Sequence, residues 1–356
     1  MEISNIDKNF VIEKSLNEAD LEFYNVKEEP FRLYGFYDPK NESRFLRMSE
    51  MAAKAVSPEV ESLNDNTAGG RVRFSTNSPY VAIRVKMPPY GAMPHMTLCG
   101  SAGFDLYEDK GVSSFYIGTF FPTYEAAPTG QYEQILYLSN HNFRNFTIDF
   151  PLYHNVDSLY VGLKKGSSLQ SGLEYACEKP VVYYGSSITQ GGCASRPGNS
   201  YQSILSRRLN LDHVNLGFSG NGMGETTMAE YIASLSMSAF VMDYDHNAPT
   251  PEHLMNTHGQ FFDIVRGAQK ELPIIFISRP NFRADRIEDI LCRNIISDTY
   301  MRAIKNGDKH VYFIDGAQFF AFDGGDSCTV DGIHPNDLGF MQMANGIEPV
   351  LRQAIN

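Results

Sequence analysis

Three side chains suited to covalent catalysis occur in two short segments of the C-terminal half. Ser187 lies in segment 185–189, Gly-Ser-Ser-Ile-Thr, directly after an apolar run. Asp331 and His334 lie in segment 331–335, Asp-Gly-Ile-His-Pro. A serine becomes a nucleophile when a base takes its proton, and a carboxylate can fix the tautomer of that base. The groups that such a mechanism requires are therefore all present.

Each segment also has an ordinary structural interpretation. Serine is common in strand-to-helix turns, so Ser187 by itself is compatible with a plain turn. Asp331 and His334 followed by Pro335 are also compatible with the capped start of a helix. For either segment taken singly, both interpretations stay open.

Two further residues are candidates for stabilising a developing oxyanion. Gly220, in a segment after the second strand of this half, can bring its N–H close to a substrate oxygen. Asn247, after the third strand, offers a side-chain amide. The alternatives are a glycine turn before the next helix and a helix cap ahead of Pro251.

Three histidines in the middle of the C-terminal half are candidate metal ligands. His246, His253 and His258 are seven and then five residues apart. This spacing does not match helical ligand pairs, and the chain has no HExxH motif. We therefore expect no metal, and we expect His253 and His258 to lie at the surface of a helix.

The C-terminal half alternates apolar strands with helical stretches. Strands are expected at 181–184, 214–218, 240–242, 274–277 and 311–314. Each strand is followed by an expected helix, and these helices lie, in the same order, near 201–209, 227–235, 251–271, 287–304 and 338–354. Such βα units predict a parallel, doubly wound sheet with its ligands at the carboxyl ends of the strands. Every candidate residue above follows such a strand or precedes the last helix.

The N-terminal half reads as short strands separated by turns. Runs such as 71–75, 80–86, 114–118, 134–138 and 145–150 are rich in β-formers, and several alternate apolar and polar residues. They predict a β-sandwich of the jelly-roll kind. The polar, glycine- and serine-rich stretch 164–172 is interpreted as the join. We therefore expect a sandwich domain over 1–172 and an α/β domain over 173–356.

The composition narrows the range of partners. A formal net charge of -12 argues against sequence-independent nucleic-acid binding and against docking on anionic membranes. The N-terminus lacks the pattern of a signal peptide, and no apolar run is long enough to span a bilayer. Five widely spaced cysteines fit free thiols in a reducing cytoplasm. The oligomeric state stays open.

Taken together, the C-terminal segments resemble the SGNH (GDSL-type) hydrolases. Segments 185–188 and 219–221, Asn247 and segment 331–334 resemble the first, second, third and fifth blocks of that family, in order. The resemblance implies a flavodoxin-like fold in which Ser187 is the nucleophile and His334 the general base and acid. It also implies that Asp331 orients His334, and that Ser187 N–H, Gly220 N–H and Asn247 form the oxyanion hole. No cofactor is implied.

The N-terminal half carries its own signature. Segment 103–107, Gly-Phe-Asp-Leu-Tyr, resembles the GxDLY motif of a β-sandwich domain that precedes SGNH domains. The whole chain is thus similar to two-domain carbohydrate acetylesterases. Two departures stand out: Ser186 replaces the Asp of the first block, and the third block reads Asp-His-Asn-Ala over 245–248. In the related esterases a backbone carbonyl can replace the acid, which would make Asp331 less important.

The resemblance implies a serine esterase that removes acetyl groups from acetylated oligosaccharides, derived from mannan or from xylan. The chain has no Trp, so any aromatic side chain that stacks on a sugar ring would be a Tyr or a Phe. One alternative is a lysophospholipase or thioesterase that acts on longer acyl esters. Another is a carbohydrate-binding protein whose hydrolase part has lost activity.

Overall fold

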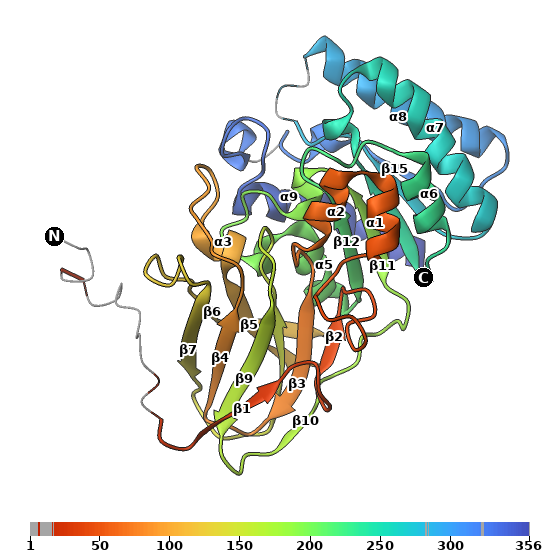
Figure 1. Ribbon diagram of the computed structural model, residues 1–356. Coiled ribbons are helices and arrows are strands. Elements are labelled where there is room, and N and C mark those ends of the chain that lie inside the picture. Colours follow the sequence, from red (N-terminus) through yellow and green to blue (C-terminus); the bar gives the residue numbers. More distant parts are fainter. Residues whose placement is uncertain are drawn as a thin grey trace.

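The computed structural model describes residues 18–355 apart from 282, 284, 322 and 323, together with residues 6, 7 and 16. Two antiparallel sheets form the lower part of the molecule in Figure 1, and a parallel sheet flanked by helices forms the upper part. Among the described residues, no helix combines the length and the apolar character that crossing a membrane requires.

The parallel sheet contains the predicted strands of the C-terminal half. Its strands are β11 (Val181–Gly185), β12 (His213–Gly217), β13 (Ala239–Asp243), β14 (Ile274–Ile277) and β15 (Val311–Ile314). They lie in the order β12-β11-β13-β14-β15, and every neighbouring pair is parallel. This is the 2-1-3-4-5 order of flavodoxin-like folds, so the predicted fold class is confirmed.

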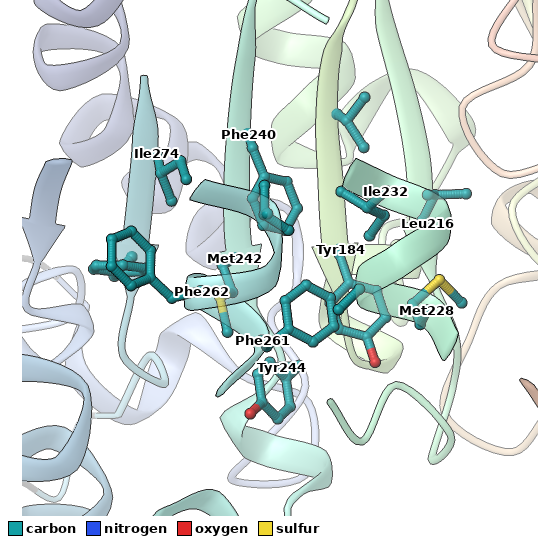
Figure 2. Packing of buried hydrophobic residues seen from close by; sticks show 14 of the residues in the cluster. Tyr184, Leu216, Met228, Ile232, Phe240, Met242, Tyr244, Phe261, Phe262 and Ile274 are labelled. Carbon is teal, nitrogen blue, oxygen red and sulfur yellow. The ribbon is translucent and has the colours of Figure 1, made fainter. Parts of the chain in front are cut away.

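Helices cover both faces of this sheet. One face packs on α5 (Tyr201–Leu209) and α9 (Asp337–Ile355), and the other on α6 (Thr226–Ala233), α7 (Pro251–Ala268) and α8 (Ile287–Lys305). Figure 2 shows the second face, where Tyr184 and Phe240 of the sheet stack on Phe261 of α7. Each such ring pair contributes about 1 kcal/mol beyond the area that it buries.

The N-terminal half forms two antiparallel sheets. The first has the order β1-β9-β4-β7, with β1 (Leu21–Asn25), β4 (Tyr80–Lys86), β7 (Gln131–Tyr137) and β9 (Ser158–Lys164). The second has the order β10-β3-β8-β5-β6, and β2 also pairs with β3. Its strands are β2 (Arg32–Tyr34), β3 (Arg71–Thr76), β5 (Phe104–Lys110), β6 (Ser113–Phe120), β8 (Arg144–Asp149) and β10 (Leu169–Ser171).

The two antiparallel sheets share one core. Val81 and Val161 of the first sheet lie in the same buried cluster as Phe74, Leu106 and Phe146 of the second. A β-sandwich is therefore present as predicted, whereas its jelly-roll connectivity stays a prediction. The stretch 164–172 is not merely a connection, because residues 169–171 pair with β3 as strand β10. The division of the chain at 172/173 likewise stays a prediction.

Three helices in the N-terminal half were not predicted: α1 (Glu50–Val56), α2 (Pro58–Asn64) and α3 (Leu98–Ala102). Met48, Ala53 and Val60, on and just before α1 and α2, belong to the same buried cluster as Phe240 of the parallel sheet. Figure 1 shows α1 and α2 beside the α/β part rather than on the sandwich. The N-terminal half thus completes the core of the C-terminal half.

A buried arginine links the two halves. Arg71 of β3 hydrogen-bonds to the Asp212 carboxylate, to His213 O at 3.0 Å, and to His213 Nε2 at 2.9 Å. Because arginine only donates hydrogen bonds, the Nε2 atom accepts and the imidazole is neutral. Burial first, and then the positive charge of Arg71, lower the pKa of His213 well below its ordinary value.

This neutral histidine predicts a loss of stability in mild acid. Below about pH 6.5 the unfolded chain takes up a proton at residue 213 that the folded chain does not, so the free energy of unfolding falls by up to about 1.4 kcal/mol per pH unit. Denaturant titrations of the wild type and of His213→Gln between pH 7 and pH 5 measure the slope. The variant should show the shallower dependence.

The exposed His141 provides the control, because His141→Gln should retain the wild-type slope. Equal slopes for the wild type and for His213→Gln would contradict the assignment of His213 as a buried neutral base.

Candidate active site

Ser187 begins the short helix α4 (Ser187–Gln190) directly after strand β11. The turn is close-packed against the ends of two neighbouring strands. A Cβ on Gly185 would lie 2.1 Å from Asp243 O, and a Cβ on Gly217 would lie 2.2 Å from Gln190 N. Only glycine fits either position, and this packing fixes Ser187 at the carboxyl end of the central strands.

Ser186 takes up the role of helix cap. Its side chain is buried, and its hydroxyl accepts a hydrogen bond from Ile188 N–H at 3.2 Å. An aspartate is the usual residue at this place in the resembled family, and both residue types are good N-caps. The substitution therefore preserves the local start of α4.

A continuous hydrogen-bonded chain runs from Ser187 to Asp331. Ser187 Oγ lies 2.9 Å from His334 Nε2, and His334 Nδ1 lies 2.7 Å from Asp331 Oδ2. Since a carboxylate accepts the Nδ1–H proton, Nε2 is the acceptor that faces the serine hydroxyl. These are the distances that proton transfer from serine to imidazole requires.

A tight turn fixes the carboxylate of Asp331. Its Oδ1 accepts the N–H groups of Ile333 at 3.0 Å and of His334 at 2.8 Å. Partial burial raises the pKa of Asp331, but hydrogen bonds from the N–H and ring of His334 outweigh burial and lower that pKa to about 2. Asp331 therefore remains an anion wherever proteins are usually assayed, and the side chain rather than a backbone carbonyl contacts Nδ1.

The candidate oxyanion donors lie at the ends of three neighbouring strands. Ser187 follows β11, Gly220 follows β12, and Asn247 lies in the 3-10 turn Asp245–Asn247 after β13. Among the described residues, the N–H groups of Ser187 and Gly220 have no hydrogen-bond partner. Gly220 has a φ of +71° and faces open space. Asn247 Nδ2 donates to Phe218 O at 2.9 Å, which leaves its second proton free to donate.

The loop that carries Gly220 is anchored from both sides. Gln190 Oε1 accepts Ser219 N–H at 3.0 Å, and its Nε2 donates to Asn66 Oδ1 at 3.0 Å. Behind the loop, Arg47 donates to the carbonyls of Asn215 and Gly217 at the end of β12. Burial lowers the pKa of Arg47 to about 9, so its guanidinium remains charged at neutral pH.

Tyr153 brings the N-terminal half into contact with Ser187. Its hydroxyl donates to Ser187 O at 3.0 Å. Burial raises the pKa of Tyr153, so the hydroxyl keeps its proton. Sequence reasoning did not identify Tyr153, Arg47 or Gln190, because none lies in a motif and their partners are distant along the chain.

The three histidines considered as metal ligands are not brought together. His253 Nε2 contacts Met223 O, and His258 Nδ1 contacts Thr299 Oγ1. The expectation that His258 lies at the surface was wrong, because its ring is buried between α7 and α8. Helix α7 directs His258 inward, toward Phe276 of the sheet.

Segment 103–107 clamps the loop that follows α4. Asp105, whose side chain is fully buried, accepts hydrogen bonds from Arg196 Nη1 and from Gly198 N–H, both at 2.8 Å. Tyr107 hydrogen-bonds to Arg196 and covers Gly198, where a Cβ would lie 2.2 Å from the tyrosine oxygen. The motif thus connects the sandwich to the site.

Comparison with known proteins agrees with this architecture. Residues 178–352 match the GDSL-like lipase/acylhydrolase family, and residues 21–169 match the GxDLY domain found at the N-terminus of SGNH-hydrolase-type esterases. The C-terminal half therefore carries a GDSL-like (SGNH-type) hydrolase domain, and the N-terminal half carries the GxDLY domain. No curated protein matched the chain.

Several solved structures share the whole architecture. A GDSL-like lipase described as putative, from Bacteroides ovatus, is 29% identical with a TM-score of 0.84, covering 94% of this chain and 98% of that one. The salicylyl-acyltransferase SsfX3 of a tetracycline biosynthetic pathway is 18% identical with a TM-score of 0.76, covering 96% and 100%. An acetyl xylan esterase from the rumen bacterium Butyrivibrio proteoclasticus is 12% identical with a TM-score of 0.60, covering 94% and 98%.

The clamp at Asp105 predicts a large stability effect from a small change. In Asp105→Asn, Arg196 loses its buried anionic partner, so the free energy of unfolding should fall by about 3 kcal/mol. Asp157→Asn, at an exposed position, should change it by less than about 0.5 kcal/mol. Chemical denaturation of both variants measures the difference, and equal stabilities would contradict the clamp.

Proposed function

We propose that the chain is a serine esterase that removes O-acetyl groups from acetylated oligosaccharides derived from plant mannan or xylan. The observation that carries the proposal is the hydrogen-bonded chain from Ser187 through His334 to Asp331. A chain of this kind activates a serine toward an ester carbonyl with protein groups alone. The acetyl xylan esterase with the same fold supports the choice of substrate class, through a likeness of fold only.

The proposed reaction has two halves. In the first, His334 takes the Ser187 proton as Oγ attacks the acetyl carbonyl, and the N–H groups of Ser187 and Gly220 with the Asn247 amide hold the oxyanion. His334 then protonates the sugar alcohol as it leaves. In the second, water activated by His334 attacks the acetyl-serine and releases acetate.

A second candidate function is hydrolysis or transfer of larger acyl groups. Val330 and Ile333, which lie in the same loop as Asp331, expose 48% and 44% of their surface. Apolar groups at this place favour a longer or aromatic acyl chain over an acetyl group. The likeness to the Bacteroides ovatus protein, at 29% identity, is compatible with this candidate.

Replacement of the nucleophile tests the proposal. Ser187→Ala should lower acetate release from acetylated manno- and xylo-oligosaccharides by at least about 10³-fold, because the covalent route is lost. Ser234→Ala, at an exposed serine after α6, should behave as the wild type. Acetate is measured enzymatically on variants whose folding is checked by circular dichroism.

An acyl-length series on the wild type separates the candidates. Acetyl esters should give the highest kcat/KM if the proposal holds, whereas a preference for octanoyl or aromatic esters would favour the second function. Binding of the glycans without turnover of any ester would favour a non-catalytic carbohydrate-binding protein.

The contact between Asp331 and His334 predicts a strong effect of Asp331→Asn. An asparagine can still accept the N–H groups of the turn, but it no longer stabilises the imidazolium or fixes the tautomer. We expect kcat to fall by about 10²- to 10⁴-fold with little change in KM. Steady-state kinetics on an aryl acetate measure both constants, and a fall below about threefold would show that another group orients His334.

A further inference from the structure

Two residues outside the triad lie against its imidazole. They are His95, in the exposed loop before α3, and Cys193, just after α4. The Cys193 sulfur, one ring nitrogen of His95 and one ring nitrogen of His334 all lie within 4.8 Å of one another. The rings of His95 and His334 are 5.6 Å apart between centroids. No other trio of metal-ligating side chains in the described part of the chain meets this spacing.

The segments that carry these residues are held together by the fold. Thr97 Oγ1 donates to Ser195 O, and Gly100 packs so closely on Ala194 O that a Cβ would lie 2.2 Å from it. Cys193 itself is buried, with a left-handed φ of +77° that cysteine rarely adopts. These contacts therefore fix the Cys193 thiol beside the His334 imidazole. They also bring it close to His95, although Cys193 and His95 are almost 100 positions apart in the sequence.

The triad also prepares His334 to be a metal ligand. Asp331 accepts the Nδ1–H proton, so Nε2, whose lone pair accepts the Ser187 hydroxyl proton in the metal-free protein, is the nitrogen that can bind a metal. A carboxylate behind a ligating histidine is the usual second shell of a zinc site, because it fixes the tautomer and raises the basicity of the ring. Two imidazoles and one thiolate are also the ligands that Zn²⁺ prefers, with a fourth position open to water.

We propose that His95, Cys193 and His334 form a binding site for Zn²⁺, and that its occupation inhibits the enzyme. The inhibitory part of this proposal rests on the esterase function proposed above. On binding, the Cys193 thiol releases its proton to solvent and its sulfur coordinates the cation. Nε2 of His334 donates its lone pair to the metal and can no longer accept the Ser187 proton. The net charge of -12 favours the approach of a cation.

The test uses the full chain, freed of metal with a chelator. Zn²⁺ is titrated by calorimetry, Co²⁺ by absorbance, and hydrolysis of an aryl acetate is followed in parallel. The wild type should bind one equivalent of Zn²⁺, show the near-ultraviolet thiolate band with Co²⁺, and lose activity that the chelator restores.

Variants at the two residues outside the triad identify the site. Cys193→Ser and His95→Gln should retain the activity of the metal-free wild type and weaken Zn²⁺ binding by at least about 10-fold. The Zn²⁺ concentration that halves the activity should rise by the same factor. Cys193→Ser should also lose the Co²⁺ band. Cys177→Ser and His141→Gln, at a free cysteine and an exposed histidine elsewhere, should bind and respond as the wild type.

The outcomes separate this site from the proposed function. Binding and inhibition that are unchanged in Cys193→Ser and His95→Gln would overturn the site, as would the absence of Zn²⁺ binding by the wild type. If the wild type hydrolyses no ester, the esterase function and inhibition fail, while calorimetry and the Co²⁺ band still decide whether the site exists.

Discussion

The carboxylate of Asp105, buried where the β-sandwich meets the α/β part, holds the loop on which the site depends. It binds Arg196 and the N–H of Gly198, in the loop between α4 and α5. The same loop reaches the segment that carries Asp331 and His334, because Asp337, at the start of α9, accepts the N–H of Ser195 at 2.8 Å. One anchored loop therefore links the segment after α4 to the start of α9, close in sequence to His334.

The α/β part was predictable because its signals are local. Buried apolar runs and helical periodicity gave β14 at 274–277, β15 at 311–314 and α5 at 201–209 with the observed bounds. Ser187, Asp331 and His334 were found because two motifs carry them. Helices α1 and α2 were missed since the core that buries them comes from residues far along the chain. Tyr153 and Arg47 were missed for the same reason.

The candidate oxyanion donors rest on groups from both halves. Gly220 and Asn247 come from loops of the α/β part, but Arg47 supports the end of β12 and Tyr153 holds the carbonyl of Ser187. Backbone donors stabilise a developing charge best when they are fixed before the reaction. Loops of the N-terminal half therefore hold the candidate site groups in place, whatever part this half also has in binding a substrate.

The position of α1 bears on how this protein can be divided or recombined. A fragment that begins at residue 173 would lack Met48, Ala53 and Val60, and it would leave the apolar surface of Met228 and Ile232 on α6 open to water. A chimera that takes its N-terminal half from a relative would need apolar residues at the positions of Met48, Ala53 and Val60, as well as the strands of the sandwich. The two halves thus share one hydrophobic core, and a boundary near residue 172 cuts through the packing rather than between two separate cores.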